Sequence, residues 1–578
     1  MYANSFFHLP FTTFQKDRFT PGANNNGFEN LNLKDTYIQM VPFFGQCAGM
    51  YPWATARFSY ALALADPQAL KEEIIKYLAL DWQKHRAYDN ILGNHRGDNV
   101  EYAFNYWSMS KLIYDYVTST SDFAFLNEVH SGFYGQRTIL SYLEEITDLP
   151  EKIHNTQDQL VDFGNDYNLW EYNIHCDLGN RLVHYVFSPN AERYNQNKML
   201  ANLYQQRGNY FESEKRNQKA NSIKEAIFSR LWDPQVGTFN SNFPVPMVLH
   251  TLDFEGFWQN KENEKNALIN FAFTNPATNF IGTHGFTSLP TSWDQNCFLT
   301  PNPTPTGSSC QTPNHWCKRE DWHGPGLYTG EVMHILKGLF KEGQKEKAME
   351  MLNKYSYLAN APFWGEALPF NKPSFNQSGY AAISYMDGGF GFSEVIIQGL
   401  FGVQTDSYIT TIFPRIPANF GETSLTDLNV QSHKFDIHIN QNNTIHTVDM
   451  CVGCRRTADG PPVDHTRIRY GTEGRKKVIF TFRNLENGFY TIKQDNQIIG
   501  FQRVQNNILN FTVNNWEGVH NLFILSGGDA NQDGFVNEED FQIWLEGFRS
   551  ASQLKNADFN NDGRVDGIDY EYWRRQQE

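Results

Sequence analysis

Two short stretches near the C-terminus place side-chain oxygens at alternate positions around a glycine. In "GDANQDGFVNEED", residues 528–540, counting from Asp529 puts Gly534 at position 6, where a calcium-binding loop must turn sharply. A hard cation needs several converging oxygens, and alternate positions of a tight loop supply them. The candidate ligands of this copy are Asp529, Asn531, Asp533, the backbone carbonyl of Phe535, Asn537 and Asp540.

The second stretch, "ADFNNDGRVDGID", residues 557–569, repeats the pattern in register. Asn and Asp are also common in ordinary turns, but a tandem repeat with the same oxygen spacing favours two calcium sites. We therefore predict Ca²⁺ as the bound cofactor of this tail. The candidate ligands of this copy are Asp558, Asn560, Asp562, the backbone carbonyl of Arg564, Asp566 and Asp569.

Both loops end in Asp at position 12, where helix–loop–helix calcium sensors carry a bidentate Glu. Each loop is followed by an apolar stretch of helical character, and no helix of useful length precedes the first. The tail, residues 527–578, thus resembles a dockerin, the duplicated calcium module that attaches secreted polysaccharide-degrading enzymes to a cohesin partner. The resemblance implies export and a body concerned with carbohydrate.

Composition narrows the class of the remaining chain. Of 578 residues, 40% are hydrophobic and 19% charged, which is enough apolar content for packed cores. The net charge of −16 argues against nucleic acid as a partner. The 15% of aromatic residues suits stacking on sugar rings, although most of them are expected in the core.

The sequence was searched for a membrane span and for a signal peptide. No run of eighteen apolar residues occurs, so we expect no membrane span. The first residues, "MYANSFFHLPFTTFQKDRF", show neither the basic start nor the apolar core of a signal peptide. A secreted or cell-surface location is expected from the dockerin resemblance, with no leader visible in this chain.

The hydrophobic period divides the chain. After an N-terminal extension at 1–32, residues 33–404 have mostly a helical period, with helix–turn–helix pairs joined at Asp66–Pro67, Gly208 and Gly343. The stretch 327–342 places an apolar stripe on one helical face. Residues 405–526 instead alternate apolar and polar side chains between Asn and Gly turns, which predicts an antiparallel β-sandwich.

Seven cysteines are present. The pair in "CVGC", Cys451 and Cys454, is interpreted as a local disulfide or two free thiols rather than half of a zinc site. Two of Cys297, Cys310 and Cys317 are expected to pair in an oxidising setting.

Several motifs of the helical region occur in an informative order: "LVDFGNDYNLWEY", "VFSPNAERYNQNKMLANLYQQRGN", "SRLWDPQVGTF", "WHGPGLYTGEVMHIL" and "WGEALPF". They resemble the (α/α)6-toroid glycoside hydrolases, in particular the mannosylglycerate-hydrolase-like and trehalase–processing-glucosidase group. The resemblance implies six helical hairpins around a central cleft, with sugar-binding loops at one end. Two departures are the "MYPWATARFSYAL" of the first hairpin, where many relatives have Trp–Asp, and the lack of a preceding β-sandwich.

Glycosidic hydrolysis needs two carboxyl groups, one to protonate the departing oxygen and one to activate water or attack directly. The resemblance implies inversion of the anomeric centre. For the base we favour Glu366, which follows a helix in "FWGEALPF". For the acid, Asp166 matches the pattern of the processing glucosidases, whereas Asp162 and Glu171 match that of the mannosylglycerate-hydrolase-like proteins, and the sequence does not decide between them.

Other polar and aromatic positions could line a sugar subsite, with a Trp ring under the sugar and Asp or Arg on its hydroxyl groups. For each of them, core packing or helix capping is an equally good interpretation. The candidates are Trp53, Arg57, Arg96, Asp98, Trp170, Trp293, Asp321, Trp322, His323 and Trp364.

The sequence thus predicts a multidomain, mainly α protein: an (α/α)6 toroid, an antiparallel β-sandwich and a small helical dockerin-like module. The favoured function is an exported glycoside hydrolase with a carbohydrate substrate and a cohesin-type partner. Two alternatives stay open. One is a non-catalytic carbohydrate-binding component of a surface assembly, and the other is a toroid phosphorylase or polysaccharide lyase.

Overall fold

The structure is a computed structural model, and each statement below concerns the residues that it describes. These are 13–15, 36–38, 49–50, 52–83, 87–89, 95–96, 103–163, 185–239, 246–282, 285–286, 327–328, 332–355, 367–368, 391–406, 409–417, 420–431, 433–452, 454, 466–485, 488–495, 497–504, 506–526, 528, 530–531, 538–550, 557–559 and 564–577. They fall into two compact units, one ending at Gly399 and one beginning at Leu400, with Thr118–Ser121 grouped with the second.

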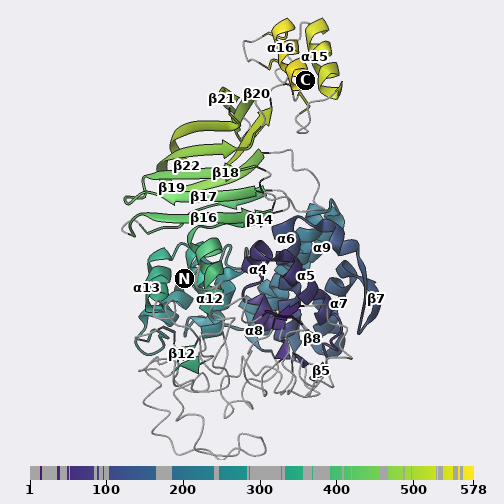
Figure 1. The fold of residues 1–578 in the computed structure, drawn as a ribbon. Coiled ribbons are helices and arrows are strands. Elements are labelled where there is room, and N and C mark those ends of the chain that lie inside the picture. Colours follow the sequence, from purple (N-terminus) through teal and green to yellow (C-terminus); the bar gives the residue numbers. More distant parts are fainter. Residues whose placement is uncertain are drawn as a thin grey trace, which may run out of the picture. The chain divides into compact units, whose positions relative to one another are not determined.

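The first unit is helical (Figure 1). Its helices are α3 (Pro52–Ala56), α4 (Ser59–Ala65), α5 (Pro67–Tyr77), α6 (Phe104–Thr120), η3 (Phe123–Asn127), α7 (Ile139–Ile153), α8 (Phe187–Gln206), α9 (Tyr210–Arg230), η6 (Pro246–Asp253), α10 (Glu262–Ile269), η7 (Asn270–Thr274), α12 (Val332–Lys341), α13 (Lys345–Lys354) and η9 (Val395–Leu400).

The expected helix–turn–helix pairs are confirmed, and the local chemistry explains where each one turns. Asp66 ends α4 and caps α5 by accepting a hydrogen bond from the Ala69 amide, with Pro67 in the first turn. Gly208 adopts a φ of +75° between α8 and α9, a backbone conformation that glycine enters without a steric penalty. Gly343 turns the chain from α12 into α13 in the same way.

The helix expected over 327–342 is shorter than predicted, although it contains the whole apolar stripe from Val332 to Phe340. Helix α12 begins at Val332, and Leu327–Tyr328 form strand β12 instead. This strand pairs antiparallel with β13 (Ala367–Leu368). Residues 329–331 lie outside the described residues.

Six segments contact one another in chain order through buried side chains. Ser59 of α4 donates to Asp115 of α6, Gln196 of α8 donates to Ser110 of α6, and Tyr194 of α8 donates to the Glu255 carbonyl just after η6. Asp253 of η6 pairs with Lys337 of α12, and Lys337 donates to Glu394 at 2.8 Å. Glu394, next to η9, then accepts from the backbone amide of Tyr60 in α4, so the contacts close on themselves.

The six segments have a larger fraction of buried side chains than the helices that follow them in the chain. Almost every described residue of α6 and α12 is buried, because neighbours surround these helices on all sides. Helix α9 buries only about one side chain in three, as expected for a helix with one face in solvent. The first unit therefore has an inner set of segments (α4, α6, α8, η6, α12 and 391–400) and an outer set (α5, α7, α9, α10 and α13).

The second unit contains one nine-stranded sheet with the order β16-β17-β18-β19-β22-β20-β21, to which β14 and β15 are added beside β19 (Figure 1). The strands are β14 (Gln404–Asp406), β15 (Ile409–Ile412), β16 (Thr423–Val430), β17 (His433–Ile439), β18 (Ile445–Cys451), β19 (Thr466–Arg483), β20 (Gly488–Gln494), β21 (Gln497–Val504) and β22 (Ile508–Ser526).

The strand periodicity predicted from sequence is confirmed, but two pairings are not antiparallel. β18 pairs parallel with β19, as does β15, while the remaining pairs run antiparallel. Alternation of side chains is the same in both pairings, so it cannot reveal strand direction. The fourteen-residue connection from 452 to 465 is long enough for the crossover that a parallel pair needs.

At the end of β18, Cys451 and Cys454 form a disulfide, as one of the two expected alternatives. Cys297, Cys310 and Cys317 lie outside the described residues.

The C-terminal module has two helices, α15 (Glu538–Ser550) and α16 (Gly567–Gln577). Aromatic side chains join them: the rings of Phe541 and Trp573 lie 4.9 Å apart, and those of Trp544 and Tyr570 lie 5.0 Å apart. Across the described part of the whole chain, no helix has both the length and the apolar character needed to cross a membrane.

Replacing Glu394 should strongly destabilise the helical unit. In Glu394→Gln the buried Lys337 keeps Asp253, but Lys337 and Lys111 both lose Glu394, which leaves one positive charge of the buried cluster uncompensated. We therefore expect a loss of about 3–5 kcal/mol. The measurement is the first unfolding transition in urea. The control is Glu350→Gln, whose side chain is 63% exposed beside Lys354 and should change stability by less than about 1 kcal/mol. Equal midpoints for the two variants would contradict the role of Glu394.

Candidate functional site

The connections of the helical unit are unequal in length. Three inner segments lead to outer helices through short links, at residue 66, residues 207–209 and residues 342–344, whereas the links 121–138 and 254–261 are longer. Outer helices lead to the next inner segment through long ones: 78–103, 154–186, 231–245, 275–331 and 355–390. Because inner and outer helices alternate in direction, each long connection starts and finishes at the end where the inner segments begin. The candidate catalytic residues 162, 166, 171 and 366 all fall in long connections.

Short strand pairs flank two of these connections. β8 (Asn155–Gln157) and β9 (Leu160–Asp162) form a hairpin in which Asn155 lies opposite Asp162. β13 begins at Ala367, directly after Glu366 in the sequence, and pairs with β12. The chain is therefore held by backbone hydrogen bonds at Asp162 and immediately after Glu366.

Most of the candidate residues lie outside the described residues, so their predicted roles stay predictions: Asp98, Asp166, Trp170, Glu171, Trp293, Asp321, Trp322, His323, Trp364 and Glu366. Asp162 is half-buried at the end of β9. For Arg96 only the backbone, in β5 (His95–Arg96), is described.

Trp53 and Arg57 are brought together. The Arg57 guanidinium lies over the Trp53 ring at 4.4 Å, and both side chains are buried. This contact is a cation–π interaction, which is stronger when it is removed from water. It uses a face of the indole ring that a stacking sugar would otherwise need.

A buried polar centre, which the sequence analysis did not identify, lies among the inner segments. The rings of His250 and His334 are 4.6 Å apart, and the Trp107 ring meets both at nearly right angles. Burial lowers the pKa of His250 to about 3 and, with help from Lys337, the pKa of His334 well below its usual range. Both imidazoles are therefore neutral near pH 7 and pack as rings.

Asp253 supplies the charge of this centre. Burial acts to raise the pKa of Asp253, but the nearby ammonium groups of Lys337 and Lys341 outweigh it and hold that pKa well below its usual range. The apolar stripe of α12 gave no signal for this centre, because His334 and Lys337 lie on the helical face opposite to that stripe.

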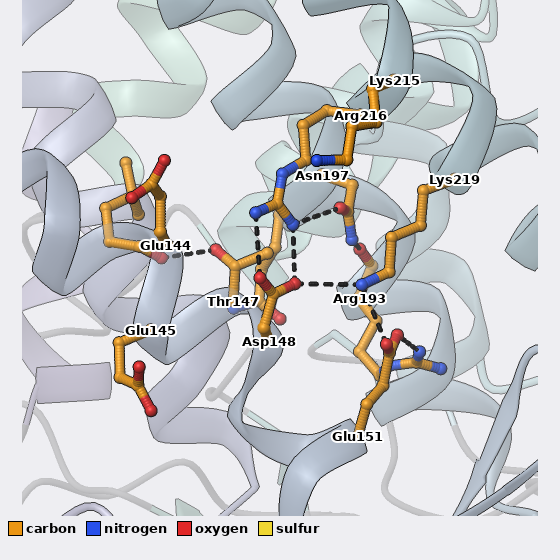
Figure 2. A network of polar contacts seen from close by, with 12 residues as sticks. Glu144, Glu145, Thr147, Asp148, Glu151, Arg193, Asn197, Lys215, Arg216 and Lys219 are labelled. Atoms are coloured by element: carbon orange, nitrogen blue, oxygen red, sulfur yellow. Dashed lines mark hydrogen bonds and ion pairs between the residues drawn. The ribbon is translucent and has the colours of Figure 1, made fainter. Parts of the chain in front are cut away.

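A second network joins α7, α8 and α9 (Figure 2). Arg216 holds both carboxylate oxygens of Asp148, at 2.6 and 2.9 Å, and Lys219 donates to the same carboxylate. Glu151, one turn further along α7, pairs with Lys219 and Arg193. Burial acts to raise the pKa of Asp148, yet these cationic donors lower it to about 2. The network fixes the three helices that surround the β8–β9 hairpin.

The calcium-loop candidates show a repeated hydrogen-bond pattern. Asp540 accepts from the amides of Ala530 and Asn531, and Asp569 accepts from the amide of Phe559 at the equivalent position. Both carboxylates are buried. In each loop the last position therefore lies against the second.

Some of the remaining candidate ligands are among the described residues, and the others are not. Asn531, Asp558, Arg564 and Asp566 are described, and Asp566 donates its amide to Asp569. Asp529, Asp533, Phe535, Asn537, Asn560 and Asp562 lie outside the described residues. Within the described residues alone, no three acidic, His or Cys side chains are grouped as a metal site. The donor types present, carboxylate and amide oxygens, nonetheless fit a hard cation such as Ca²⁺.

Comparison with known proteins identifies the tail: residues 527–575 match the dockerin type I domain family. Dockerin type I domains bind calcium and attach to cohesins, and the proteins that carry them are typically extracellular or on the cell surface. No curated protein sequence matches the chain.

Solved structures of similar fold include the following two. One is a sialidase, with 14% identity over 73% of this chain and a TM-score of 0.51. The other is a GH78-family rhamnosidase of Bacillus sp. GL1, with 11% identity over 76% of this chain and a TM-score of 0.50. The matched regions are 37% and 41% of those two chains, so this protein spans less than half of either. Its neighbours in fold are thus glycoside hydrolases, at low sequence identity.

Asp148→Asn should weaken the helical unit in a pH-dependent way. Since the pKa of Asp148 is depressed to about 2, its contribution is complete above about pH 4, the range of an unfolded Asp, and is lost as the pH falls through about 2. The stability difference between wild type and variant should therefore be largest at neutral pH and shrink in acid, as measured by urea unfolding at several pH values. Asp158→Asn is the control, because that side chain is 70% exposed. A difference that is independent of pH would contradict the assignment.

Proposed function

We propose that this protein is an exported glycoside hydrolase whose catalytic body, residues 33–404, is an (α/α)6 toroid. The observation that carries the proposal is the closed series of contacts among six inner segments, ending with Glu394 against Tyr60. Among the described residues, five outer helices follow five of these segments, which supports five of the six helical hairpins of the proposed ring. The fold similarity to a sialidase and a rhamnosidase supports the same class.

The proposed active site is at the end of the toroid where the inner segments begin. All long connections meet this end, and loops on a rigid scaffold are where binding and catalytic groups concentrate. Glu366 is the proposed base, and one of Asp162, Asp166 and Glu171 is the proposed acid. A water molecule between the two carboxyl groups would attack the anomeric carbon while the acid protonates the leaving oxygen, which inverts the configuration.

For residues 405–526 we propose a β-sandwich. Strand β19 pairs with β15 through its first part and with β18 through its last, and its register with β22 shifts between Thr472 and Val478. Irregularities of this kind bend a strand, so that one continuous sheet can fold into two facing layers. Residues 1–32 are proposed as an N-terminal extension.

The substrate class is proposed from the chemistry of the neighbours. α-L-Rhamnosides are the first compounds to test, followed by sialosides, α-linked disaccharides and mannosyl- or glucosyl-glycerates. The carbohydrate and a cohesin-type protein are the proposed partners, the latter through residues 527–578. Nucleic acid is not proposed, because the net charge of −16 would repel it.

Glu366→Gln should abolish most of the activity. Loss of a general base costs about 10²–10⁴-fold in rate, so kcat should fall by that factor while the melting temperature is unchanged. The assay is release of reducing sugar from the panel, with the anomer of the first product followed by NMR. Glu350→Gln on the exposed face of α13 is the control and should keep full activity.

Three other outcomes would be informative. Full activity of Glu366→Gln overturns the base assignment. Retention of anomeric configuration overturns the inverting mechanism. A wild-type protein that binds a sugar of the panel without hydrolysing it would instead be a non-catalytic carbohydrate-binding component.

Calcium removal should loosen the C-terminal module and leave the helical unit folded. We propose that the two loops bind one Ca²⁺ each, and chelation with EDTA should then free Trp544 and Trp573 from their ring contacts. Tryptophan fluorescence and hydrogen exchange of residues 527–575 measure this, and calcium should restore both signals. A double variant, Asp540→Ala with Asp569→Ala, should resemble the chelated protein. Signals that do not respond to EDTA would contradict calcium binding.

A further inference from the structure

Strand β9 is attached to helix α8 by a single buried amide side chain. Asn190 accepts a hydrogen bond from the Val161 amide at 2.8 Å and donates to the Val161 carbonyl at 3.1 Å. Both backbone groups of Val161 are thus satisfied by one side chain, in the way a neighbouring strand would satisfy them. Asn190 also donates to the Val186 carbonyl at 2.8 Å, which fixes its own orientation at the start of α8.

The turn before the strand is held by the same helix. Asp158 and Gln159 connect β8 to β9, both with positive φ, as in a two-residue hairpin turn. Arg193 donates to the Gln159 carbonyl at 2.9 Å and to the Asn190 side chain at 2.9 Å. Arg193 in turn pairs with Glu151 of the α7–α9 network (Figure 2). The hairpin is therefore tied to three helices through hydrogen bonds.

Packing alone does not require these hydrogen bonds. Leu160 and Val161 are already buried, and their side chains would hold the strand loosely in place. Hydrogen bonds to the backbone restrict movement along the strand, which apolar contacts resist poorly because they have no direction. The residue that follows Val161 is Asp162, the first of the three carboxylates from which the acid is proposed.

We propose that Asn190 is a positioning residue for Asp162 acting as the acid: through Val161 it sets the place of β9 and so of the backbone that carries this carboxylate. This inference rests on the proposed glycosidase function. It makes a specific claim about the reaction, because a displaced acid slows only those steps in which the leaving group needs a proton. A displacement of about 1 Å can cost about 10²-fold in rate.

The kinetic test compares leaving groups. The probes are phenyl and dinitrophenyl α-L-rhamnosides, or the same two aglycones on whichever panel sugar the wild type hydrolyses. In Asn190→Ala, kcat should fall about 10–100-fold on the phenyl glycoside, which needs the acid, and by less than about 3-fold on the dinitrophenyl glycoside, which leaves unaided. Asn190→Asp keeps the acceptor for the Val161 amide and should recover part of the loss.

The matched control is Asn197→Ala. Asn197 is a buried asparagine on the same helix, bonded to Arg216 and to the Arg193 carbonyl rather than to β9. It should lower stability without any dependence on the leaving group. Hydrogen exchange supplies an independent readout: the Val161 amide should exchange faster in Asn190→Ala and unchanged in Asn197→Ala.

The possible outcomes distinguish failure of the Asn190 role from failure of the proposed hydrolase function. An equal loss on both glycosides, or the same kinetics in Asn190→Ala and Asn197→Ala, overturns the positioning role while leaving the hydrolase proposal intact. A Val161 amide that stays protected in Asn190→Ala overturns the anchoring itself. A wild type that hydrolyses no glycoside refutes the proposed function and this role with it.

Discussion

The helical unit depends on one buried carboxylate. Glu394 is fully buried and receives hydrogen bonds from Lys337 and from the Tyr60 backbone, which lie at opposite ends of the series of inner segments. A charge in such a place is stable only when its partners are fixed, so the ion pair specifies which helices must be neighbours. Apolar packing alone is less directional, so it would not specify which helices must be neighbours. Lys337 extends the same charge network to Asp253, so the last three inner segments are defined by one chain of interactions.

The buried centre around His250 and His334 and the network around Asp148 and Arg216 have different structural roles. The central one contains neutral histidines, paired charges and aromatic rings, and its role is to fix the inner segments. The peripheral one, around Asp148 and Arg216, joins three helices and continues through Arg193 to a short strand. This continuity connects the stability of the scaffold to the placement of a carboxylate. It also explains why so many long polar side chains occur on the inward faces of α7, α8 and α9.

The sequence predicted some levels of this structure better than others. The capping residues Asp66, Asn209 and the glycines at 208 and 343 set helix ends through local chemistry, so those ends were predictable. The parallel pairing of β18 with β19 was not, because alternation carries no information on strand direction. The centre formed by Trp107, His250 and His334 brings together positions more than 200 residues apart, and no local pattern signals such a meeting. The calcium loops were the opposite case, since all their oxygens come from a single short stretch.

The unequal connections of the helical unit have an evolutionary consequence. At the end with short links, a residue added to a tight turn such as the one at Gly208 or Gly343 would shift a helix by a fraction of a turn and disturb its buried face. At the other end, insertions change only the length of connections that are already long. Sequence can therefore change there by loop exchange, while the paired helices beneath stay the same.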